Sequence, residues 1–206
     1  MENNILFDEL VKTSSFTSEK KRVTVTKEEI IINDKGLHLA EVTEFLYGLE
    51  PIQLDMFYIG TKYIIDLKTP NNQLSIVFKT YWGLSRKDIY NHYTHILNSI
   101  WEKTGVRLVN NAIDRILMDE LIVVGNCTIA KRGILFKDVL TEWDNLSYQR
   151  TYNKLVLNNK SNSKIYTNLY RTKTYNIDVL TNILDWVFKS EGIKELQKEK
   201  LASEDL

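Results

Sequence analysis

An internal repeat limits the folds open to this chain more than any other feature of its sequence. Region 63–105 has the order strand, turn, strand, aromatic loop and helix, and region 152–192 has the same order. The two helical segments align without a gap at an offset of 87 residues, which places Trp101 on Phe188 and Gly105 on Gly192. Gaps in the alignment fall only in turns, where insertions are tolerated, so we interpret the repeat as two copies of one domain.

The front halves of the two copies match as well. Residues 24–34 align with 128–138 at an offset of 104, and residues 42–45 align with 140–143 at an offset of 98. Alternating and β-branched residues predict strands in both matched stretches. Gly48 and Pro51 argue against a long helix after position 42, so a strand is favoured there too.

Apolar residues at helical spacing predict three helical segments besides the helix of the second copy. A short one covers 5–11, and a longer one contains Ile89, Tyr93 and Trp101, with Gly105 as a left-handed C-cap. A third apolar stripe, 109–117, lies between the copies, where it predicts a linker that packs on one or both domains. The expected division is, in chain order, an N-terminal helix and linker (1–19), a first domain (20–105), a helical linker (106–119), a second domain (120–192) and a charged C-terminal tail (193–206).

Several antiparallel strands followed by one amphipathic helix form a pattern that this chain shows twice. The paired strands 24–32, the segment 41–45, the hairpin 63–79 and the closing helix with Trp101 together resemble the bacterial pleckstrin-homology-like (PH-like) domain, in tandem. The resemblance implies an α+β fold in which each copy is a bent antiparallel β-barrel or sandwich closed by a C-terminal amphipathic helix.

The resemblance also implies two kinds of partner, because some family members bind phosphoinositides through basic residues of the first hairpin and others bind proteins. In the first copy Lys27 is followed by two glutamates, which repel a phosphate. The second copy offers Lys131, Arg132 and Lys137, a fragment of such a site. A protein partner is therefore favoured over a lipid headgroup.

Composition excludes several other classes of protein. The 206 residues carry 27 basic and 27 acidic side chains, so no net field attracts nucleic acid or anionic lipid, and no nucleic-acid partner is expected. Cys127 is the only cysteine, which excludes an internal disulfide and a cysteine-based zinc site. No signal peptide or membrane-spanning apolar run is recognised, which predicts a cytoplasmic protein.

Catalytic and metal-binding patterns are sparse. His92 and His95 lie three residues apart on the predicted helix, with Asp88 four residues before His92, which makes them weak candidate metal ligands. The alternative is a solvated helix face. Cys127 is predicted to be a small buried residue of a strand. No set of convergent catalytic residues is recognised, so no cofactor and no enzymatic activity are expected.

One stretch is rich in cations and tyrosines and free of acids. Between 146 and 176 there are six basic residues, five tyrosines and no Asp or Glu. Such a surface suits an acidic protein partner, although outward Lys and Tyr residues are also ordinary in a strand hairpin. The candidate partner-binding residues are Arg150, Lys154, Tyr170, Arg171 and Lys173, with Trp82 in the matching loop of the first copy.

These observations leave three functional hypotheses. The first is a non-enzymatic protein-binding protein, one form of which is an immunity or inhibitor protein that neutralises its partner by direct binding. The second is a lipid-headgroup or membrane-surface binding module. The third is an enzyme or metal-binding protein that uses His92 and His95. The sequence defines neither the partner nor the oligomeric state.

Overall fold

The structure is a computed structural model, and it describes residues 5–189. The chain divides into two compact units, Met1–Arg107 (unit 1) and Leu108–Leu206 (unit 2). The predicted C-terminal tail, 193–206, lies outside the described residues.

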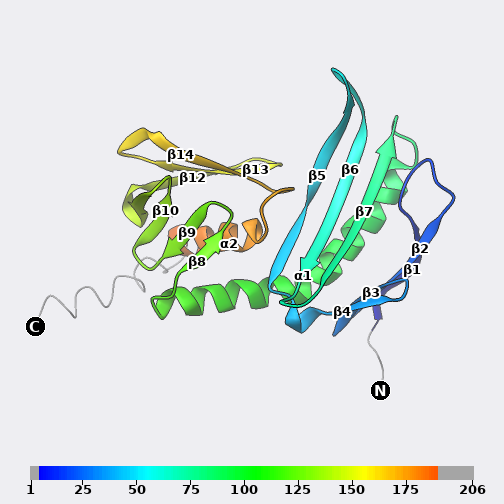
Figure 1. Ribbon diagram of the computed structural model, residues 1–206, viewed down its shortest axis with the longest axis horizontal. Helices are drawn as coiled ribbons and strands as arrows, with labels where there is room; N and C mark the ends of the chain where they lie inside the picture. The colour runs from blue at the N-terminus through cyan, green and yellow to red at the C-terminus, as the bar shows by residue number, and fades with distance from the viewer. Residues whose placement is uncertain (1–4, 190–206) are drawn as a thin grey trace, which may run out of the picture. The chain divides into compact units, whose positions relative to one another are not determined.

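Unit 1 contains two antiparallel sheets followed by a helix (Figure 1). Its first sheet is formed, in spatial order, by β1 (Ile5–Lys12), β2 (Lys20–Thr26), β3 (Glu29–Ile32) and β4 (Lys35–His38). The short 3-10 helix η1 (Leu39–Glu41) leads to the second sheet, β5 (Glu44–Leu54), β6 (Phe57–Lys68) and β7 (Gln73–Tyr81), and then to α1 (Arg86–Leu117).

Unit 2 follows the same order of elements. Its first sheet consists of β8 (Ile122–Val124), β9 (Cys127–Ala130), β10 (Gly133–Phe136) and β11 (Val139–Glu142). The 3-10 helix η2 (Trp143–Asn145) precedes β12 (Leu146–Arg150), β13 (Lys154–Asn159), β14 (Asn162–Tyr170) and α2 (Ile177–Lys189). The α+β class is confirmed, but each unit holds two small sheets, and no strand pairing of the described residues closes them into a barrel.

The predicted N-terminal helix is wrong, because this segment is strand β1. It pairs antiparallel with β2 from Ile5 to Lys12, with an irregular register between Ile5 and Phe7. Phe7 and Val11, which are an even number of residues apart and so lie on one face of the strand, are buried, while Ile5 and Leu10 are exposed. Tertiary pairing with β2 overrides the local pattern here, since strand preference depends on neighbouring strands.

The predicted helix end at Gly105 is also wrong. Helix α1 continues to Leu117, so the predicted linker 106–119 is for the most part the second half of this helix. Gly105 serves packing instead of capping: a Cβ added there would lie 2.4 Å from the indole of Trp101, one turn earlier. The glycine therefore makes room for a large aromatic side chain on the same helix face.

Trp101 and Phe188, which the repeat alignment matched, occupy corresponding places, and each is half-buried. The Trp101 ring lies 5.6 Å from Phe45 and 6.0 Å from Tyr47 between ring centroids. Phe188 lies 6.5 Å from Trp143 and 5.6 Å from Tyr148. In both units the helix thus packs an aromatic ring against a pair of rings from the preceding strand region.

One part of the predicted repeat alignment is shifted by an element. Residues 140–142 belong to β11 and Trp143 begins η2, whereas Val42 follows η1 and Phe45 lies in β5. By order of elements, Trp143 corresponds to Leu39, the buried first residue of η1. The offset of 104 found for the preceding strands therefore continues through the 3-10 helix.

Candidate functional site

The hairpin of β5 and β6 has an end that no third strand covers. Pairing of β6 with β7 runs only as far as Gly60 opposite Tyr81, so the chain from Gln53 to Ile59 forms a two-stranded ribbon that extends past β7 (Figure 1). An irregular register between Ile52 and Gln53 bends the ribbon where it leaves the sheet. Its two-residue turn is Asp55–Met56.

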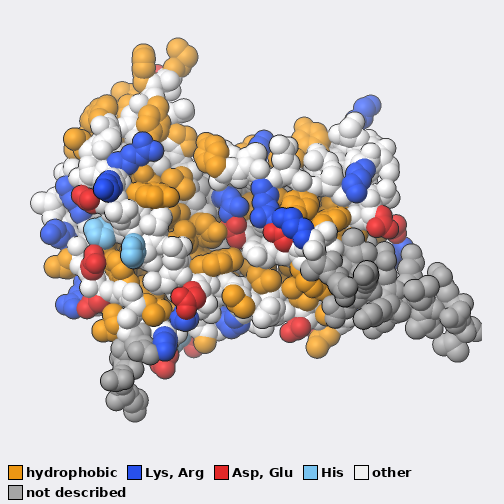
Figure 2. Space-filling model, turned by 180° about the vertical axis from the view of Figure 1, so that it is seen from behind, with side chains coloured by type: hydrophobic (Ala, Val, Ile, Leu, Met, Phe, Trp, Pro, Cys, Tyr) orange, Lys and Arg blue, Asp and Glu red, His pale blue; other side chains and the backbone are white. Residues whose placement is uncertain are grey.

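Large apolar side chains gather on this ribbon and face solvent. Their relative exposures are 63% for Leu54, 93% for Met56, 73% for Phe57 and 57% for Tyr58. We call these four residues the apolar tip. Figure 2 shows hydrophobic side chains at this end of unit 1. Contiguous exposed apolar surface of this kind marks interaction sites, whereas apolar residues exposed one by one need no explanation.

An aromatic cluster lies beside the base of the ribbon. Phe16 stacks on Tyr81 at 4.9 Å between ring centroids and meets Trp82 edge-on at 5.5 Å. Phe16 and Trp82 are exposed, Trp82 to 67%. The backbone N–H of Trp82 donates to the Ile59 carbonyl at 2.8 Å, and this bond joins the cluster to the start of β6.

Backbone hydrogen bonds fix the position of Phe16. The Lys79 N–H donates to the Thr13 carbonyl at 2.9 Å, and the Ser15 N–H donates to the Lys79 carbonyl at 3.0 Å. The Tyr81 N–H donates to the Ser15 side-chain oxygen, also at 2.9 Å. These bonds join the segment after β1 to β7, so three segments distant in sequence build one surface. We call the apolar tip and the aromatic cluster together the apolar end of unit 1.

The close approach of two strands underlies this surface and requires a glycine. A Cβ on Gly60 would lie 1.9 Å from the Thr80 carbonyl oxygen. Any other residue would push β6 away from β7 at the point where the ribbon leaves the sheet. The ribbon and the aromatic cluster remain adjacent because this position has no side chain.

Of the residues of this surface, only Trp82 was predicted from the sequence as a binding residue. The signal was available, since Met56, Phe57, Tyr58 and Ile59 form an unbroken apolar run directly after a turn residue. A run of this length at a turn cannot be buried by simple strand alternation. Phe16 could not be found in this way, because its neighbours come from tertiary contacts.

The two arginines of the predicted basic surface are paired with acids of α2. Arg171 forms an ion pair with Asp178, and its side chain is only 18% exposed. Arg150 pairs with Asp185, which also accepts a hydrogen bond from the Tyr148 hydroxyl at 2.7 Å. The run 146–176 contains no acidic residue, but in the folded chain two acidic residues from outside the run lie against it.

Three of the named residues remain together at the surface of unit 2. Lys154 lies opposite Tyr170 in the β13–β14 pairing, and the Lys173 ammonium lies 5.9 Å from the centre of the Tyr170 ring. Tyr170 is 44% exposed. This group is a smaller positive surface than the sequence suggested, because both arginines have acidic partners.

Two titrating groups of unit 2 are perturbed for structural reasons. Burial raises the pKa of Asp185, but hydrogen bonds from Arg150, Lys189 and Tyr148 outweigh it and hold that pKa at about 2. Burial in β9 raises the pKa of the Cys127 thiol to about 12, and the cysteine is buried, as predicted. Neither group adjoins a nucleophile–base pair that would suit catalysis.

The candidate metal ligands do not converge. The His92 Nε2 lies 3.0 Å from the Glu9 carboxylate on β1, and His95 is exposed. Across residues 5–189, no three His, Cys, Asp or Glu side chains gather at a position that would hold a metal ion. His92 instead joins β1 to α1 within unit 1.

Comparison of the chain with protein-family models, curated proteins and solved structures finds no match. Neither of the described α-helices combines the length and the apolar character that crossing a membrane requires.

Proposed function

We propose that this protein is a non-enzymatic binding protein that captures a protein partner through the apolar end of unit 1. The observation that carries the proposal is the exposed apolar tip, held on a ribbon that only its own two strands support. Exposed aromatic and methionine side chains are the residue types enriched in protein interfaces. When a partner buries these side chains, the removal of apolar surface from water contributes favourable free energy to binding.

A protein partner is favoured over a membrane surface by the charges around the tip. Asp55 stands in the turn itself, and Lys62, in the three-stranded part of the sheet below the ribbon, is paired with Glu50 at 3.1 Å. An anionic membrane would meet an acid first, which membrane-surface anchors avoid. In unit 2, Arg132 pairs with Glu142 at 2.9 Å and Lys137 lies 4.4 Å from the centre of the Tyr166 ring, so these cations have other contacts.

We retain the PH-like relationship as part of the proposal. Its support is the order of elements, four strands, three strands and a closing helix, which occurs in both units. A tandem of two such scaffolds that acts by occluding its partner would be an immunity or inhibitor protein. Such a role requires only a binding surface and no catalytic group.

The test measures partner capture by variants of the apolar tip. The full-length protein, tagged, is used to capture its partner from the native host, and the captured protein is identified and its affinity measured. Met56→Ser with Phe57→Ser should leave the folded structure intact and weaken binding by roughly 30-fold or more, the effect of losing a hot spot of about 2 kcal/mol. Met118→Ser, at a methionine of unit 2 that is also exposed, is the control and should bind as the wild type does.

Three outcomes would contradict the proposal. Loss of binding in Lys154→Glu with Lys173→Glu, with full binding by the tip variant, would place the site on the tyrosine-rich surface of unit 2. Sedimentation with anionic vesicles that depends on Met56 and Phe57, in the absence of any protein partner, would assign the tip to a membrane surface. Unchanged partner affinity in the tip variant excludes the tip directly.

A further inference from the structure

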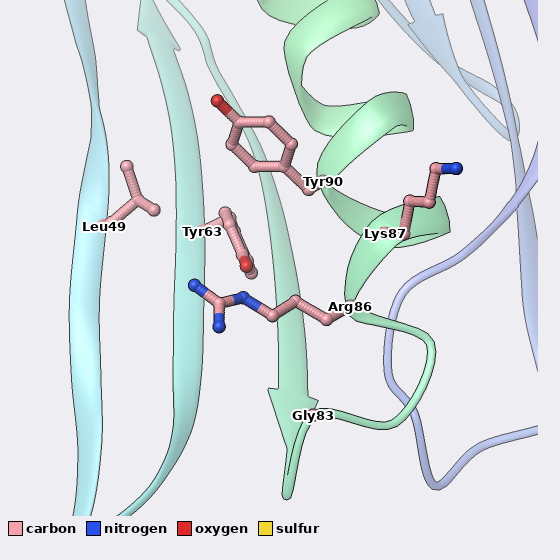
Figure 3. A pocket seen from close by; sticks show the side chains of 6 residues that line it. All are labelled: Leu49, Tyr63, Gly83, Arg86, Lys87 and Tyr90. Atoms are coloured by element: carbon pink, nitrogen blue, oxygen red, sulfur yellow. The ribbon is translucent and has the colours of Figure 1, made fainter.

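A pocket of about 460 Å³ opens at the N-terminus of α1 in unit 1. Its lining comes from β5, β6, the loop before α1 and the first turns of α1 (Figure 3). The lining residues are Leu49, Tyr63, Gly83, Arg86, Lys87 and Tyr90. Leu49 and the two tyrosine rings form apolar walls, and the two cations stand at the helix start.

The polar groups of this pocket are hydrogen-bond donors without acceptors. Arg86 and Lys87 form no ion pair with any residue between 5 and 189. The first α-helical hydrogen bond is donated by Ile89 to the Ser85 carbonyl at 3.0 Å, and the N–H groups of Lys87 and Asp88 have no acceptor among the described residues. A helix N-terminus with free N–H groups and adjacent cations favours an anion.

Tyr63 supplies an independent observation. It is a core residue with 1% relative exposure, yet its hydroxyl has no hydrogen-bond partner in the described part of unit 1. Figure 3 shows this hydroxyl directed toward the guanidinium of Arg86, while Lys87 extends away on the other side of the helix turn. The Tyr63 side chain is thus buried apart from the hydroxyl edge that borders the pocket, and the orientation of an unpaired hydroxyl toward a cation there indicates a place for an acceptor.

The tyrosine rings add a surface for an organic group. Tyr90 is about half exposed, and its ring lies 6.2 Å from that of Tyr63 between centroids. The pocket is larger than an inorganic anion needs, and its remaining wall is aromatic and aliphatic. A ring carried by the ligand would pack against Tyr90.

From these groups we infer that the pocket binds a phosphate monoester of a small molecule with a ring or compact organic body. Three terminal phosphate oxygens match the set of donors better than the two oxygens of a carboxylate. Arg86 would bind the phosphate, Tyr63 would donate its hydroxyl, and the α1 N-terminus would contribute N–H groups. Lys87 would add positive potential from the rim.

The start of the helix in unit 2 is arranged differently. There, the first turn of α2 contains Asp178, which is buried and paired with Arg171, so this acid already has a cationic partner within the chain. In unit 1 the corresponding first-turn acid, Asp88, is exposed and does not line the pocket.

The experiment titrates the full-length protein with inorganic phosphate, phenyl phosphate and phenol, following backbone amide shifts of Lys87 and Asp88 by NMR. Phenyl phosphate should bind several-fold tighter than inorganic phosphate, and phenol should not bind. Arg86→Gln should weaken phenyl phosphate binding by about ten-fold or more, because it removes a charge-assisted hydrogen bond. Tyr63→Phe should weaken it several-fold, and Lys87→Gln should have the smallest effect.

Lys164→Gln, at an exposed lysine of unit 2, is the control for a general loss of charge and should leave binding unchanged. Arg86 is exposed, so its variant tests the site even if Tyr63→Phe perturbs folding. Phenyl phosphate affinity that is equal in wild type and Arg86→Gln overturns the proposal, and so does phenol binding as tightly as phenyl phosphate. Binding to vesicles containing phosphatidic acid, without binding to phenyl phosphate, overturns the assignment to a soluble ligand.

Discussion

Asp185 on α2 is the residue that converts the predicted basic stretch of unit 2 into a charge-balanced surface. Its carboxylate forms ion pairs with Arg150 and, at 2.7 Å, with the Lys189 ammonium, and it accepts a hydrogen bond from the Tyr148 hydroxyl. Three donors on one carboxylate fix the start of this sheet to the helix. The arginine that seemed available for a partner is thus part of the structure of unit 2.

The pH dependence of stability should show the contribution of Asp185. Its pKa is about 2 in the folded chain, below the ordinary value of an aspartate, so its charged form stabilises the fold above about pH 4 and this contribution is lost as pH falls toward 2. Asp185→Asn should lower the free energy of unfolding by roughly 1 kcal/mol at pH 6. Urea unfolding of both proteins from pH 6 to pH 2 measures the difference, which should shrink across that window. A difference that is constant with pH would show that the charge of Asp185 is not responsible.

Cys127 should be unreactive while the chain is folded. Burial raises the pKa of its thiol to about 12, and the side chain is almost fully covered in β9. Because the thiolate is the reactive form, a thiol reagent such as DTNB should modify Cys127 at pH 8 only when urea unfolds unit 2. The measurement is the rate of thiol release with and without denaturant, and rapid reaction of the native protein would contradict the burial.

Two opposing effects decide how an alanine at Gly105 would change the stability of helix α1. Alanine favours a helix interior by about 1 kcal/mol over glycine. A Cβ at this position would, however, lie 2.4 Å from the Trp101 indole, and that ring is held by Phe45 and Tyr47. The clash involves the middle of the ring and not a flexible side-chain end, so we expect it to dominate.

Gly105→Ala should therefore destabilise the protein by roughly 1–3 kcal/mol, the cost of an overpacked site. Thermal unfolding measures the change. With Trp101→Leu in place the clash is gone, and the same Gly105→Ala substitution should become stabilising by up to about 1 kcal/mol. A stabilising Gly105→Ala in the wild-type background would mean that Trp101 moves at little cost.

Local patterns predicted the elements whose partners are near in sequence. The hairpin of β6 and β7, the helix that follows it and the buried strand around Cys127 were found from period, turns and apolar runs. The segment now seen as β1 was misassigned, because the burial of Phe7 and Val11 depends on β2. Gly105 was misread since its role depends on a side chain one turn away.

The candidate sites show the same limit at larger distance. Arg171 is seven residues from Asp178 and could have been matched to it, but Arg150 and Asp185 are 35 residues apart and meet only through the fold. The apolar end of unit 1 combines Phe16, the tip of the β5–β6 ribbon and Trp82, which no single window contains. Charge runs and exposed aromatics were visible in the sequence, but their neighbours were not.

For the whole molecule, the notable element is α1, because it belongs to both units. Residues 86–107 of this helix lie in unit 1, where the Arg107 guanidinium donates to the carbonyls of Leu39 and Val42 at 3.0 and 2.6 Å. The helix continues into unit 2, where Leu108, Ala112 and Ile116 are buried. A break in the helix near residue 107 should therefore lower the stability of both units.

Val106→Pro tests this coupling, because Val106 is exposed and only the backbone change matters. Proline removes a helical hydrogen bond and clashes with the preceding turn, at a cost of roughly 3 kcal/mol. We expect the slowest-exchanging amides of both units, for example those in β6 of unit 1 and in β13 of unit 2, to lose protection in hydrogen exchange. Asp88→Pro is the control, since the first helical hydrogen bond is donated by Ile89 and a proline at position 88 removes none. Loss of protection confined to one unit would show that the two units fold independently despite the shared helix.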